Sequence, residues 1–171
     1  MNSFRKLQKQ NVPLRTNVDQ CNTAERLTIW AIRLWSAGQR KNANIFSHIV
    51  EGFRQHGTIQ GATNIILLLD TIVAGLNRNI EINCSCFVFI GDDERKILEV
   101  IKICQNQPHV DISSKLSDFL NPAAIQLSTP LFHDLANALM SASLFLSDEW
   151  ILNEEEKALI HTDENYSSSI H

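Results

Sequence analysis

The sequence predicts an all-α protein, a single-domain bundle of about five helices around one buried central helix. Apolar residues recur every three to four positions along most of the chain, the period of a helix with one buried face. A single stretch, 80–90, has the two-residue period of an extended segment. The 171 residues, 44% hydrophobic and 20% charged, suffice for one core and are too few for two.

Three parts follow from composition. Residues 1–21 are basic and lack a sustained period, so we expect a flexible arm. Residues 22–147 hold the helical domain. Residues 148–171 form an acidic tail that we expect to be partly disordered.

Capping signals delimit the first two helices. Asn22 followed three residues later by Glu25 has the form of a capping box, and Gly38 favours an end near residues 39–41. The second helix, about 43–55, ends before Gly57, because glycine readily takes the left-handed conformation that follows a helix.

The third helix, about 59–77, has apolar residues in nearly every direction around its axis. This pattern predicts a helix that packs against several neighbours and is the most buried element. The extended segment 80–90 follows it, and no second segment offers a convincing pairing. A paired strand and an extended connector therefore both stay open.

Three further helices complete the domain. One covers about 93–106, with acidic residues at its start, and a short one ends at Leu120. We expect the last to begin after Ser128, with Pro130 in its first turn, where the missing N–H does no harm, and to reach about Leu146.

Charge is divided unevenly along the chain. Residues 1–57 carry nine Lys/Arg and three Asp/Glu, a net charge of +6, whereas residues 58–171 carry six and sixteen, a net charge of −10. Such poles attract over a Debye length of about 8–10 Å at physiological salt. We therefore expect a protein partner or a homodimer.

The first helix supplies candidate interface or anion-facing residues, which are Arg26, Trp30, Arg33 and Arg40. The three arginines recur every seven residues and so share one stripe of the helix. Ile29 and Ile32 lie away from the main apolar face of this helix. They suggest more apolar surface than one intramolecular packing covers, or contacts with the arm or the tail of the same chain.

Asp70 is a candidate buried polar residue, because it follows five apolar residues in the central helix. Such a carboxylate would form a structural ion pair or hydrogen bond, or it would line a pocket. Cys84 and Cys86 are the main group of metal-type ligands, with Cys104 and His109 downstream. Their surroundings are apolar, so we expect no metal, and no disulfide, since a bridge across one residue would be strained.

These observations favour a non-enzymatic, cytoplasmic interaction or regulatory protein that self-associates. One alternative is a small enzyme or ligand-binding protein with a pocket around Asp70 and the Cys84/Cys86 region. Another is a nucleic-acid-associated protein that uses the basic N-terminal third, against which the isoelectric point of about 5.8 argues. We expect no cofactor, since no phosphate-binding glycine motif occurs, and no membrane insertion, since no apolar run approaches about 18–20 residues.

Overall fold

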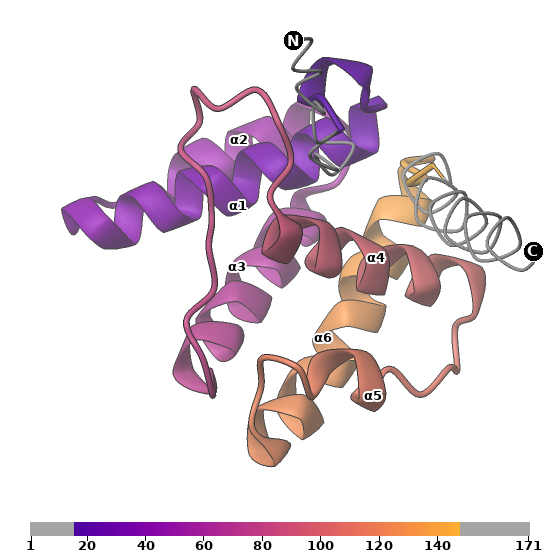
Figure 1. Ribbon diagram of the computed structural model, residues 1–171. Coiled ribbons are helices and arrows are strands. Elements are labelled where there is room, and N and C mark those ends of the chain that lie inside the picture. The colour runs from indigo at the N-terminus through magenta and orange to yellow at the C-terminus, as the bar shows by residue number, and fades with distance from the viewer. Residues whose placement is uncertain (1–15, 148–171) are drawn as a thin grey trace, which may run out of the picture.

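The structure, a computed structural model, describes residues 16–147, and this part is all-α (Figure 1). A short 3₁₀ helix, η1, precedes six α-helices, and no β-strand occurs within the described part. Their bounds are η1 Val18–Gln20, α1 Thr23–Lys41, α2 Phe46–Gln55, α3 Ile59–Ala74, α4 Asp92–Asn106, α5 Ser113–Leu116 and α6 Pro122–Ser141. The predicted helical bundle is confirmed, and none of these helices is long and apolar enough to cross a membrane.

Helix α3 lies in the middle of the bundle and contacts α1, α2 and α6 (Figure 1). Helix α4 packs on α6 and on α1, which closes the core from the other side. The helices α3 and α6 approach so closely that the space beside Gly75 is filled by Ala124, leaving no room for a Cβ atom. A glycine is therefore required where these two helices meet.

The burial of α3 is less complete than its sequence predicts. Leu68 is fully buried, but the neighbouring Leu67 is 48% exposed, and Val73 is exposed as well. The helix also ends at Ala74 and not at residue 77. Its neighbours cover only part of its circumference, so one apolar side of α3 faces solvent.

The predicted extended segment 80–90 is a connector and not a paired strand. It belongs to a long loop that passes α1 between the end of α3 and the start of α4 (Figure 1). Its partner is the end of the predicted arm: Val18 N donates to Val88 O at 2.8 Å, and Ile90 N donates to Thr16 O at 3.0 Å. The rest of the arm, residues 1–15, and the tail, residues 148–171, lie outside the described residues.

Helix α6 begins earlier than predicted, at Pro122, and Pro130 lies inside it. The side chain of Asn121 accepts the Ala124 N–H at 2.9 Å, which caps the helix, and Pro122 needs no N–H partner in the first turn. Thr129 Oγ1 donates to Ile125 O at 2.7 Å within the helix. The Ser-Thr-Pro sequence resembles a helix start, but here it continues one.

The end of α6 was also predicted wrongly, since the helix ends at Ser141 and not near residue 146. Ser143 adopts a left-handed φ of 59°, and the chain then turns toward α4. There the Gln105 amide donates to Leu144 O at 2.9 Å and accepts the Leu146 N–H at 3.0 Å. These tertiary hydrogen bonds replace a further turn of helix.

The two adjacent leucines of α3 test the position of the core. We expect Leu68→Ala to lower the free energy of unfolding by about 2–5 kcal/mol, because it leaves a cavity in the core where a fully buried side chain was. Leu67→Ala is the matched control and should cost less than about 1 kcal/mol, since its side chain faces solvent. Urea unfolding followed by circular dichroism measures both, and equal losses would contradict this packing.

Candidate functional site

Arg33, predicted to lie on a solvent-facing stripe, is buried at 3% exposure. Its guanidinium pairs with Glu94 of α4, Nε to Oε1 at 2.8 Å and Nη2 to Oε2 at 2.9 Å. Two of its three remaining N–H groups donate to Phe87 O at 2.6 Å and to Phe89 O at 2.8 Å. The seven-residue spacing places Arg33 on the same stripe as Arg26, but the long loop covers this position.

Glu94 organises the other side of this ion pair and is fully buried. It accepts the backbone N–H of Asn83 at 3.1 Å and that of Gly91 at 2.8 Å. The Asn83 side chain also reaches Glu94 Oε2 at 3.2 Å. The sequence analysis missed Glu94, although its position three residues after Gly91 is that of a helix-capping carboxylate.

Arg26, Trp30 and Arg40 are the other three residues predicted to contact a partner or an anion, and all three are exposed. Arg26 and Trp30 line a groove of about 310 Å³ between α1 and α2, whereas Arg40 lies outside it. The groove is formed by Thr23, Arg26, Leu27, Trp30, Gly52, Gln55 and His56. The residues that α2 contributes to this groove form no sequence motif, so the sequence did not predict the groove.

Ile29 and Ile32, predicted to leave surplus apolar surface on the first helix, are buried in the core. Trp30 is instead the exposed apolar residue of α1, at 37%. A Cβ at Gly52 would lie 2.5 Å from the Trp30 ring, so only glycine lets α2 approach the indole. The six-membered edge of the ring therefore packs against the backbone of α2, while part of the ring stays open to solvent.

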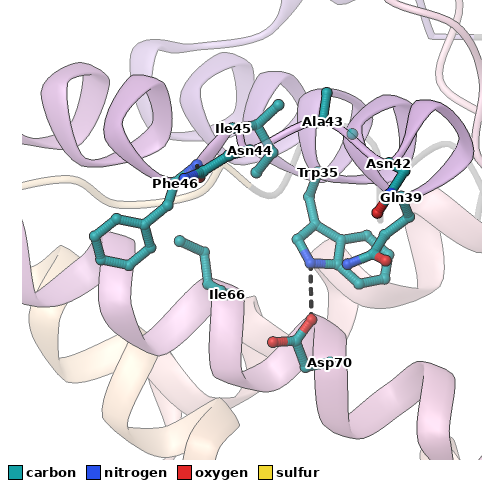
Figure 2. Close-up of a pocket in the computed structure, with 10 residues that line it drawn as sticks. Trp35, Gln39, Asn42, Ala43, Asn44, Ile45, Phe46, Ile66 and Asp70 are labelled. Atoms are coloured by element: carbon teal, nitrogen blue, oxygen red, sulfur yellow. Dashed lines mark hydrogen bonds between the residues drawn. The ribbon is translucent and has the colours of Figure 1, made fainter.

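A second pocket, of about 360 Å³, lies where the end of α1 and the α1–α2 loop meet α3 (Figure 2). Asp70 lies in it and is exposed, which corrects its assignment as a buried polar residue. Its carboxylate accepts the Trp35 Nε1–H at 3.0 Å. Asp70 lies on the incompletely covered side of α3, so the apolar residues that precede it in sequence do not enclose it.

The α1–α2 loop shapes this pocket. Residues 43–45 were predicted to begin the second helix, but Asn42 takes a left-handed φ of 49° and the helix starts at Phe46. Figure 2 shows Phe46 and Ile66 on one side of the pocket and the Trp35–Asp70 hydrogen bond on the other. Three amide side chains, Gln39, Asn42 and Asn44, also line the pocket, and Cys84 and Cys86 take no part in it.

Cys84 and Cys86 form a disulfide, which overturns the expectation that they would not be bridged. The prediction assumed a fully extended backbone. Instead, Phe87 N donates to Cys84 O at 3.0 Å and closes a turn, which brings the two Cα atoms to 5.4 Å, within the range of ordinary disulfides. No group of three or more His, Cys, Asp or Glu suited to a metal ion occurs in residues 16–147.

Cys104 and His133 form a Cys–His contact, with Sγ 4.0 Å from Nε2. Burial raises the pKa of the Cys104 thiol to about 11, whereas a nucleophilic cysteine needs a lowered pKa. The pKa of Cys21 is raised to about 12, by burial first and by Glu25 second. Both thiols are therefore suited to packing and not to nucleophilic chemistry.

Comparisons with models of protein families, with curated proteins and with solved structures gave no significant match to this chain. The surfaces described above are therefore interpreted from their own chemistry.

The buried ion pair gives a stability prediction. Arg33→Ala should lower the free energy of unfolding by about 3–5 kcal/mol, because Glu94 would be left as a buried charge without its cation. Arg54→Ala is the control, since the Arg54–Glu51 pair is solvent-exposed and we expect no measurable change. Urea unfolding of both variants decides the matter, and similar stabilities would show that the Arg33–Glu94 pair does not anchor the fold.

Proposed function

We propose that this protein is a non-enzymatic interaction protein that self-associates through the groove between α1 and α2. The observation that supports this most directly is Trp30, whose ring packs against α2 at Gly52 yet remains 37% exposed. Tryptophan and arginine are the residues most enriched among those that dominate binding energy at protein interfaces. A cytoplasmic location belongs to the same proposal; the free thiols of Cys21 and Cys104 are compatible with it, whereas the exposed Cys84–Cys86 disulfide is more typical of an oxidising compartment.

The partner we propose is the acidic C-terminal segment of a second copy. Arg26 at the groove, and Arg40 and Lys41 at the end of α1, are exposed cations. In sequence, residues 148–171 carry seven Asp/Glu and one Lys, together with the apolar run Trp150-Ile151-Leu152. Such a segment complements a groove that presents the indole of Trp30 and the guanidinium of Arg26, because apolar contact supplies affinity and charge supplies orientation.

Self-association is tested by light scattering of the full chain at micromolar concentration and at two salt concentrations. We expect a dimer that weakens at the higher salt concentration, because exposed charge pairs are screened. Trp30→Ala should raise the dissociation constant about thirtyfold or more, the effect of a dominant interface residue. Arg26→Glu should weaken the dimer mainly at low salt.

Leu127→Ala is the matched control, because Leu127 is an exposed apolar residue on α6, away from the groove. A monomer under both conditions would refute self-association. A dimer with unchanged affinity at high salt would retain the apolar contact and rule out the acidic segment as its partner.

The pocket beside Asp70 supports a second candidate function, the binding of a small polar ligand. An exposed carboxylate, three amides and an apolar wall suit a protonated amine that also carries hydrogen-bonding groups. This keeps the predicted pocket around Asp70 and drops Cys84 and Cys86 from it.

Glucosamine is a suitable probe for this pocket. We expect it to shift the NMR resonance of the Trp35 indole N–H, because that group is bonded to Asp70. Asp70→Asn should abolish binding, since it removes the charge but nearly preserves the shape of the side chain. An unchanged indole resonance at millimolar glucosamine would count against an amine ligand at this pocket.

A further inference from the structure

The four cysteines fall into two pairs with opposite properties. Cys21 and Cys104 are buried free thiols. Cys84 and Cys86 are bonded to each other at the tip of the loop between α3 and α4, where both residues are exposed. Only the second pair is open to attack by a thiol from another molecule.

The backbone on both sides of this disulfide is held by the buried ion pair. Asn83, directly before Cys84, donates its N–H to Glu94 Oε1 at 3.1 Å. Phe87, directly after Cys86, accepts from Arg33 Nη1 at 2.6 Å. The Cys-Ser-Cys tip is thus clamped at its two ends, and reduction leaves these anchors in place. The two thiols would remain close together, which favours reversible closure of the bond.

We propose that Cys84 and Cys86 form a thiol–disulfide exchange site that oxidises one dithiol molecule per chain. A substrate thiolate attacks Sγ of one of the two cysteines, the Cys84–Cys86 bond breaks, and the other sulfur leaves as a thiolate and takes up a proton. The second substrate thiol then loses its proton and attacks the substrate sulfur of the mixed disulfide; the bond between protein and substrate breaks, and the cysteine sulfur leaves as a thiolate and takes up a proton. The substrate leaves as a disulfide, and two electrons and two protons have passed to the cysteine pair.

The residues beside the disulfide indicate the substrate class. Phe87 and Val88 follow Cys86 directly, and both are exposed although they are large and apolar. Residues 84–88 carry no charged side chain. An apolar peptide segment with two cysteines can bury these side chains, whereas glutathione, a small charged monothiol, gains little from them. We therefore assign the site to cysteine pairs in apolar peptide segments.

The test incubates the oxidised full-length chain with a short synthetic peptide that has two cysteines among apolar residues. We expect one peptide disulfide per chain, and N-ethylmaleimide labels on Cys84 and Cys86 but not on Cys21 and Cys104, as read by mass spectrometry. The circular dichroism spectrum should stay that of the folded chain. The double variant Cys84→Ser, Cys86→Ser should leave the peptide reduced.

Two variants test the substrate class. Phe87→Ala and Val88→Ala should each slow exchange with the peptide, together by about tenfold or more, and leave exchange with reduced glutathione unchanged. Equal slowing with both reagents would overturn the assignment to apolar segments. A Cys84–Cys86 bond that resists excess peptide in the folded chain and is reduced only in urea would overturn the exchange site itself.

Discussion

The buried pair of Arg33 and Glu94 is the constraint on which the arrangement of this protein depends. Removing both charges from water is costly, and their attraction offsets this cost only when the remaining hydrogen-bonding positions are also satisfied. The long loop before α4 supplies these partners, as carbonyls to Arg33 and as N–H groups to Glu94. The ion pair therefore determines where this loop runs, and the loop in turn shields the ion pair from solvent.

The two surfaces of interest follow from this arrangement. The loop covers the α1 stripe at Arg33 but not at Arg26, so Arg26 and the neighbouring Trp30 remain exposed beside α2, while Ile29 and Ile32 are buried in the core. The same anchors hold the loop on either side of its tip, so Cys84 and Cys86 are presented to solvent on a fixed base. One buried interaction thus fixes the loop that covers Arg33 and positions the disulfide on it.

Local signals in the sequence were reliable where a few neighbouring residues decide the structure. The box of Asn22 and Glu25 was predicted and is present, with Glu25 N donating to Asn22 Oδ1 at 3.0 Å. Pro130 was wrongly predicted to lie in the first turn of a helix. A Ser-Thr-Pro sequence is the same at a helix start as inside a helix, where the hydroxyl groups donate hydrogen bonds to carbonyls of the preceding turn. Such ambiguities are resolved only by the segments that pack around them.

The sequence by itself predicted the all-α fold of residues 16–147 and where most of their helices lie, because these properties depend on a period of three to four residues. It did not distinguish the buried Leu68 from the exposed Leu67, because apolar residues surround the axis of α3. Tertiary structure alone decided that Arg33 faces inward and that Asp70 is exposed, because both depend on contacts or coverage that residue spacing cannot reveal. Cys84 and Cys86 meet through a local turn that the two-residue period of the segment concealed. Arg33 and Glu94 are 61 positions apart, and only the fold brings them together.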